Sequence, residues 1–420
     1  MPSPAIPAPL TEPITVRRRW MVMSLLSLAT FINYLDRGSI GVAMPVMKGE
    51  LHLSPWQQGL VFSSFFWTYA AMQIPMGWLV DRMAIKWLYA GAFALWSLAA
   101  AATGLAQGIL SLLVLRVLLG IGESIYLPGG VKVVSRQFPP DKRTLPSGFF
   151  DLGAKLGLAA ATFLDAWLLI HYGWRSLFFR TGGLGLLWLL PWVWLYPGRA
   201  DTEGPPRVRS PRRTTTLFKD RALLGLCLGF FCWDYFWYFL VFWLPSYLVA
   251  VRHISLSQLK FIGALPYLIM AATEAIGGGL ANRWIGRGRD RSLVTKGLIA
   301  VGLAFGLFVL PAAYAATTRS AVIFLCLASL SGLLTANILV VPQYCAPPDQ
   351  VALWTGIQNF WGNVGGVIAP ALTGYLVGRT GSYLSAFVCA AALLVAGIVA
   401  YVFVVPHIEL PRAGETAATL

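Results

Sequence analysis

Long apolar blocks recur along almost the whole chain and constrain its fold more than any other feature. Each block has about 20 residues or more, enough to cross the hydrocarbon core of a bilayer as a helix. Because lipid offers no hydrogen-bond partners, a spanning segment must satisfy its own backbone, which excludes open strands. We expect twelve spanning helices, at residues 20–47, 55–80, 85–107, 109–135, 144–170, 176–196, 222–250, 257–283, 293–313, 320–343, 351–378 and 383–405.

The composition excludes a water-soluble protein and gives an orientation. The 420 residues are 57% hydrophobic and only 12% charged, against about 25% charged residues in soluble proteins. The net charge of +15 comes mostly from loops at alternate ends of the segments, so a nucleic-acid partner is not needed to explain it. Lysine and arginine favour cytoplasmic loops, which predicts an inner-membrane protein with both termini in the cytoplasm. The ends predicted to be cytoplasmic carry Arg17, Arg18, Arg19, Arg82, Lys86, Arg136, Lys142, Arg143, Arg199, Arg207, Arg209, Arg212, Arg213, Lys219, Arg283, Arg287, Arg289 and Arg291.

A hydrophilic run at residues 197–221 divides the chain into two sets of six segments. Residues 148–157 align with residues 356–365 at an offset of 208, which indicates an internal duplication. Two related halves with a site between them are typical of secondary transporters. The predicted organisation is a disordered tail at 1–19, six-helix bundles at 20–196 and 222–405 joined by the linker 197–221, and a tail at 406–420.

Neither the cysteines nor the histidines indicate an enzyme or a metal site. The five cysteines fall in or beside apolar segments without metal-ligand spacing, and the four histidines lie near segment ends. A phosphate-binding loop of the Walker type is also absent from the sequence. We therefore expect a monomeric, non-enzymatic membrane protein without a metal or an organic cofactor.

Ionisable residues inside the apolar blocks carry the chemical information. Such residues cost at least about 2.5 kcal/mol to insert and usually serve a function. Arg116 and Glu123 lie seven residues apart on the fourth segment, so they share a helix face about 10 Å apart. Asp36 and Arg37 lie inside the first segment, and all four charges could meet in one cavity. They are either buried ion pairs that pack helices or an anion site, in which arginine holds a carboxylate and a carboxyl group exchanges a proton.

Further ionisable residues leave alternatives open. Asp151 and Lys155 have i,i+4 spacing in the fifth segment; they form either an internal salt bridge or a site in which Lys155 contacts substrate. Asp165 is expected near the outer end of that segment, at the interface. Asp234 is expected to face the cavity, and Glu274 lies in the eighth segment without an assigned role.

Several motifs resemble one transporter family. Residues 77–86, Gly-Trp-Leu-Val-Asp-Arg-Met-Ala-Ile-Lys, resemble the loop 2–3 signature of the major facilitator superfamily, although Ala84 stands where that family usually has glycine. More specifically, the chain resembles the anion:cation symporter branch, which includes galactonate, glucarate and hexuronate transporters and relatives of sialin. The resembling stretches are residues 33–37, 62–69, 73–75, 116–123, 242–247 and 358–366.

The resemblance implies an all-α fold of twelve transmembrane helices in two pseudo-symmetric halves, and roles for individual residues. It implies substrate contact for Arg37, Arg116, Tyr34, Tyr69 and Asn359, proton coupling for Asp36 and Glu123, and gating for Asp81 and Arg82. The remaining candidates for substrate contact are Gln73, Lys155, Trp237, Tyr238 and Asn363.

These features predict proton-coupled symport of a small organic anion, such as a hexonate, hexarate or hexuronate, by alternating access. An organophosphate/phosphate antiporter is an alternative, but the seventh segment has no arginine between Arg221 and Arg252. A facilitative transporter of another solute is a further alternative. A membrane sensor that does not transport is disfavoured because the tails are too short for an output domain.

Overall fold

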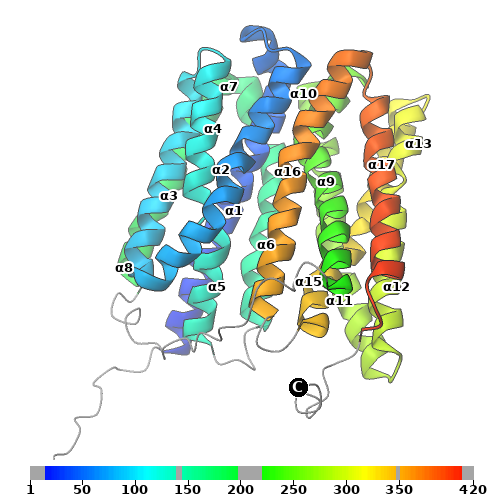
Figure 1. Cartoon of the computed structure of the whole chain (residues 1–420). Helices are drawn as coiled ribbons and strands as arrows, with labels where there is room; N and C mark the ends of the chain where they lie inside the picture. Colours follow the sequence, from blue (N-terminus) through cyan, green and yellow to red (C-terminus); the bar gives the residue numbers. More distant parts are fainter. Residues whose placement is uncertain (1–14, 139–143, 197–219, 347–350, 409–420) are drawn as a thin grey trace, which may run out of the picture.

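The computed structural model describes residues 15–138, 144–196, 220–346 and 351–408, which are helical almost throughout and contain no strand. Figure 1 shows the helices as one bundle, with α1 to α8 on one side and α9 to α17 on the other. The side chains of Asp81 and of a few other helical residues, as well as the tails and linker outside these ranges, are not part of the description.

The first half contains six spans. They are formed by α1 (Val16–Glu50), α2 (Pro55–Arg82), α3 (Ile85–Ala102) with η1 (Thr103–Leu105), α4 (Ile109–Glu123) with α5 (Tyr126–Gln137), α6 (Thr144–Ala160) with η3 (Ala161–Asp165), α7 (Ala166–Leu186) and α8 (Leu189–Leu195). The chain turns inside α7 at Gly173, whose φ of 73° is non-helical. Glycine adopts this left-handed conformation without steric cost, so α7 belongs to two successive spans.

The second half repeats this plan with six more spans. They are formed by α9 (Arg221–Ala250), α10 (Leu256–Ile262) with α11 (Leu265–Gly286), α12 (Arg291–Gly306) with α13 (Val309–Tyr314), α14 (Thr318–Ala328) with η5 (Ser329–Leu334) and α15 (Thr335–Cys345), α16 (Val351–Thr380), and α17 (Leu384–Val399) with η6 (Ala400–Val404).

All twelve predicted segments correspond to spans, with boundaries that differ by a few residues. α1 begins at Val16, because Thr15 caps it by accepting a hydrogen bond from the Arg18 amide; residues 16–19 are therefore helical and not part of a disordered tail. By length and composition alone, eight helical stretches could cross a membrane, and one of them, Phe149–Leu195, contains two spans. α1, α2 and α16 fall outside that group because they carry polar residues in their middle.

The two halves meet toward one end of the bundle, which we call the α1–α2 end because α1 stops there at Glu50 and α2 begins at Pro55. There the Ser63 hydroxyl of α2 donates a 2.7 Å hydrogen bond to the Val367 carbonyl of α16. Phe62 stacks on Phe242 of α9 with ring centroids 5.2 Å apart. Figure 1 shows α2 and α16 side by side between the halves. We call the opposite end, where α2 stops at Arg82, the α2–α3 end.

Candidate functional site

The centre of the first half contains a buried ion pair between two helices. The Nε atom of Arg37 on α1 lies 2.7 Å from Oε2 of Glu123 on α4, and these side chains are 2% and 0% exposed. The sequence predicted that both residues would lie in one site, and the structure places them in direct contact. Because α1 and α4 are separate spans, this pair fixes their relative position in the middle of the bundle.

Aromatic rings surround the guanidinium group of Arg37. Its central carbon lies 4.8 Å from the ring centre of Tyr34, 4.9 Å from Phe65 and 4.6 Å from Tyr69. Such contacts stabilise a cation by about 0.5–2 kcal/mol each, more when water is excluded. Tyr34 and Tyr69 were predicted to contact substrate, and the structure places them around the arginine. The sequence analysis did not select Phe65, although it lies in the stretch that carried the resemblance.

We call the rings of Tyr34, Phe65 and Tyr69 the Arg37 cage. Arg116 lies beside this cage and has hydrogen-bond donors that are not used. Its side chain is 2% exposed, and its central carbon lies 5.3 Å from the Phe65 ring, so one ring contacts both arginines. The Nε and Nη2 atoms of Arg116 are buried without a hydrogen-bond partner among the described residues. These two atoms form one edge of the guanidinium group, the edge that can hold a carboxylate with two parallel hydrogen bonds.

Asp36 completes the predicted group of four charges. It is 3% exposed, and neither carboxyl oxygen has a hydrogen-bond partner among the described residues. It interacts electrostatically with Glu123, Asp165 and Arg116. When all four residues are ionised, the two arginines balance the two acids, so the group can neutralise an added anion only by taking up protons.

Lys155 forms a second charged group that joins the two halves. Its Nζ atom lies 2.5 Å from Asp151 on the same helix, α6, and 3.1 Å from Glu274 on α11 of the other half. The tyrosine hydroxyl of Tyr126 lies 3.5 Å from Oδ1 of Asp151. Two carboxylates therefore hold Lys155, which favours the salt-bridge alternative over substrate contact. Glu274 had no assigned role because the sequence does not reveal which helix faces Lys155.

The remaining candidates of the second half lie on α9 and α16. Tyr238 packs against Phe66 of α2 with ring centroids 4.5 Å apart, whereas Trp237 packs against Tyr267. The Asn363 amide donates to the backbone carbonyl of Asn359, so this group is used within α16. Asp234 is 9% exposed and faces α16.

Four further candidates, Asp165, Arg82, Asp81 and Gln73, lie outside these two charged groups. Asp165, expected at the interface, is 0% exposed; that prediction was wrong because η3 packs directly on α1. Of the gating pair, Arg82 lies over the Trp78 ring at 4.0 Å, and the Asp81 side chain lies outside the described residues. Nε2 of Gln73 is buried without a hydrogen-bond partner among the described residues.

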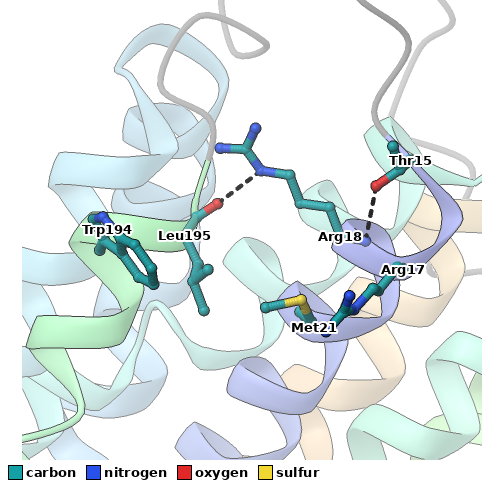
Figure 2. A pocket seen from close by; sticks show the side chains of 6 residues that line it. All are labelled: Thr15, Arg17, Arg18, Met21, Trp194 and Leu195. Atoms are coloured by element: carbon teal, nitrogen blue, oxygen red, sulfur yellow. Dashed lines mark hydrogen bonds between the residues drawn. The ribbon is translucent and has the colours of Figure 1, made fainter.

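A surface pocket at the start of α1 does not contain these charges. Figure 2 shows it at the start of α1, where Arg18 donates to the Leu195 carbonyl at 3.2 Å. It has a volume of about 450 Å³ and is lined by Thr15, Arg17, Arg18, Met21, Trp194 and Leu195. Arg18 and Arg37 are 19 residues apart on α1, or roughly 28 Å at 1.5 Å per residue. The described residues contain no group of histidine, cysteine and acidic side chains that could hold a metal ion.

Comparison with known proteins gives a consistent result. The family described as the Major Facilitator Superfamily matches residues 26–366. The hexuronate transporter of Bacillus subtilis is 32% identical over 409 residues, covering 94% of this chain and 96% of its own. A probable sulfoacetate transporter of Cupriavidus necator is 31% identical, covering 96% and 97%. The fold matches a bacterial homolog of the human lysosomal transporter Spinster, crystallised in an inward-facing and unoccupied conformation, with a TM-score of 0.78 at 19% identity, covering 92% and 97%.

Proposed function

Because the chain belongs to the Major Facilitator Superfamily, and is therefore a transporter that spans the membrane many times, we propose that it carries a small organic anion together with protons. The proposed substrate is a sugar acid, such as a hexonate, hexarate or hexuronate. The names of the relatives support this class, since one is a hexuronate transporter and another a probable sulfoacetate transporter. The sugar-acid class requires a site that recognises a carboxylate.

The observation that carries the proposal is the unused edge of Arg116. Buried donors without an acceptor cost free energy, and a carboxylate with two oxygens would satisfy both Nε and Nη2 at once. Arg37 has one further buried nitrogen without a partner, Nη2, and lies against the same Phe65 ring. We therefore assign the substrate carboxylate to these two arginines, with Tyr34 and Tyr69 beside it.

Charge balance provides the coupling in this proposal. Glu123 depends on Arg37 for its counter-ion. When a substrate carboxylate engages Arg37, Glu123 loses part of that stabilisation and a proton neutralises it. Asp36, which has no hydrogen-bond donor among the described residues, is the second acid that can take up a proton. Substrate and proton then bind together and leave together.

The contacts between the halves indicate which end of the bundle is closed. They meet toward the α1–α2 end, which the lysine and arginine pattern predicts to be the outer side of the inner membrane, with both termini in the cytoplasm. On this orientation the structure corresponds to a state closed to the outside. The inward-facing conformation of the Spinster homolog, which shares the fold, supports the same assignment. Rocking of the two halves would open the α1–α2 end.

A comparison of the wild type with Arg116→Lys tests the proposal. Purified protein is first screened by thermal shift with hexonates, hexarates and hexuronates, because a ligand at 100 times its Kd stabilises by about 2.7 kcal/mol. Uptake of the best ligand is then measured in liposomes with and without an inward proton gradient.

We expect the gradient to drive accumulation by the wild type, and Arg116→Lys to bind at least tenfold more weakly. Lysine keeps the charge but cannot form the paired hydrogen bonds, and hydrogen bonds to a charged group contribute about 1.5–3 kcal/mol each. Unchanged affinity of Arg116→Lys would remove Arg116 from the substrate site. Accumulation that is the same with and without the proton gradient would show that transport is not coupled to protons.

A further inference from the structure

Asp165 is a fully buried acid outside the group of four charges. It is the last residue of η3, a π-helical turn, and is 0% exposed. Single π-helical turns within α-helices often mark functional positions. The turn packs closely on α1, since a Cβ atom on Gly38 would lie 2.8 Å from that of Ala161. Among the described residues, no lysine, arginine or histidine forms an ion pair with Asp165.

One hydroxyl group contacts this acid and can accept a hydrogen bond from its protonated form. Oγ of Ser39 on α1 lies 2.8 Å from Oδ2 of Asp165 and 2.9 Å from the backbone oxygen of Leu35. A hydroxyl has one proton to donate and can also accept. If it donates to Leu35, the short distance to Asp165 is a hydrogen bond only when the carboxyl group carries a proton and donates it to Oγ. Both contacts are satisfied together when Asp165 is neutral.

The same hydroxyl can also serve the ionised acid. When Asp165 loses its proton, the Ser39 hydroxyl can rotate and donate to Oδ2, while the Leu35 carbonyl remains within the helical backbone of α1. Ser39 therefore offers a hydrogen bond to Asp165 in either protonation state.

Asp165 also interacts electrostatically with Asp36, one of the proposed proton-binding acids. Asp36 lies three residues before Ser39, so both occupy one face of α1, and Asp36 interacts electrostatically with both Glu123 and Asp165. Three buried acids thus run from α4 across α1 to η3. Asp165 lies eight residues before the turn at Gly173, about 12 Å along the helix, and so toward the α1–α2 end.

Other charged residues on the neighbouring helices are engaged elsewhere. Of the elements packed against η3, α1 contributes Asp36 and Ser39 to the surroundings of the acid. Among the described residues, no titratable or charged side chain of α6, α7 or α10 forms an ion pair with Asp165. These side chains are Asp151, Lys155, His171, Tyr172, Arg175, Arg180 and Lys260.

We propose that Asp165 is a third proton-binding residue of the transport cycle, which receives a proton from the α1–α2 end and passes it to Asp36. This inference rests on the proposed proton coupling. In the transfer, the O–H bond on Asp165 breaks and an O–H bond on Asp36 forms, while Ser39 turns its hydroxyl from Leu35 to the new carboxylate. The net charge of the pair of acids does not change, so no further ion is required.

The test compares Asp165→Asn with the wild type in liposomes, with D-glucuronate as the transported probe. The amide has the shape of the acid but cannot carry the proton. For one-proton symport, a gradient of one pH unit sustains about tenfold accumulation. We expect Asp165→Asn to lose this accumulation while it still exchanges labelled for unlabelled D-glucuronate. Accumulation equal to that of the wild type would overturn the proposal.

Infrared difference spectra separate this inference from the proposed function. In the spectrum of the wild type minus that of Asp165→Asn, the carbonyl band of the protonated Asp165 carboxyl group should appear, whether or not transport is proton-coupled. Absence of that band from the difference spectrum would contradict a proton on Asp165. If the wild type shows the band but its accumulation does not depend on the pH gradient, proton-coupled transport is disproved and proton binding by Asp165 still holds.

A second variant covers the case in which Asp165→Asn does not fold. Ser39→Ala removes the hydroxyl and leaves the acid in place. We expect it to lose gradient-driven accumulation and retain exchange, because the ionised form of Asp165 loses its hydrogen-bond donor. If Ser39→Ala accumulates D-glucuronate as the wild type does, Ser39 has no part in proton transfer from Asp165 and the proposed transfer is wrong.

Discussion

Replacement of Lys155 tests whether the contact between the halves is structural. Lys155→Gln removes the cation that both Asp151 and Glu274 contact and leaves two acids facing each other. Breaking a fully buried ion pair costs about 3–5 kcal/mol, whereas exposed pairs contribute about 0–1 kcal/mol. The three side chains are 13%, 36% and 19% exposed, between these limits. We therefore expect Lys155→Gln to lose about 2 kcal/mol of stability.

The charge-swapped double variant Lys155→Glu/Glu274→Lys is the matched control. It moves the cation to α11, where it can face the two acids of α6, so the number of charges and the link between the halves are kept. We expect it to regain most of the lost stability. The single variant Glu274→Gln removes only the contact across the halves, and should cost less than Lys155→Gln because Asp151 still holds the lysine.

The assay is thermal unfolding of the purified variants together with their affinity for the best anion from the screen. For a domain the size of one half, about 2 kcal/mol corresponds to a drop of roughly 4–8 °C in Tm. We expect the double variant to recover both Tm and affinity. Recovered Tm with affinity reduced more than tenfold would instead place Lys155 in the substrate site. An unchanged Tm in Lys155→Gln would refute the stabilising role of the triad.

Two further predictions concern the Arg37 cage. Glu123→Gln should still exchange labelled for unlabelled substrate in liposomes but fail to accumulate it under a pH gradient, because the amide cannot bind and release a proton; accumulation by this variant would assign the coupling proton to another acid, with Asp36 next. Tyr69→Leu removes one ring from the cage and should lower stability by about 0.5–2 kcal/mol, whereas Tyr69→Phe keeps the ring; equal Tm values for the two variants would show that the ring does not stabilise Arg37.

The fold could be predicted almost completely from the sequence, because the bilayer fixes helix length and excludes other spanning structures. The errors lie at helix ends, where local contacts decide. α1 includes Arg17 to Arg19 because Thr15 caps the helix, and no hydropathy pattern reveals a cap. The turn between the fifth and sixth spans is set by the single residue Gly173, which the pattern locates only to within a few residues.

The site was predicted less completely, since its pairings join distant parts of the chain. Arg37, Arg116, Asp36 and Glu123 were recognisable because charges are rare in apolar segments, but the partner of Arg37 is 86 residues away. Glu274 was noticed without its role, because only the packing of α11 against α6 brings it to Lys155. Asp165 lies toward the outer end as predicted, but it is buried and not interfacial, because η3 is covered by α1.

The distribution of charge gives the two halves different tasks. The cations in the middle of the described spans, Arg37, Arg116 and Lys155, all belong to the first half. In the second half the described cations lie toward helix ends, and Lys296 is occupied there by the carbonyl oxygen of Val405 at 2.5 Å. The second half instead contributes acids and aromatic rings, including Asp234 and Tyr238, to the middle of the bundle. In the mechanism that we propose, the anion therefore binds mainly to the first half, and the second half closes over it. We therefore expect variants of α9 and α16 to change substrate selectivity and closure. The requirement that the substrate carry a negative charge should depend more on α1 and α4.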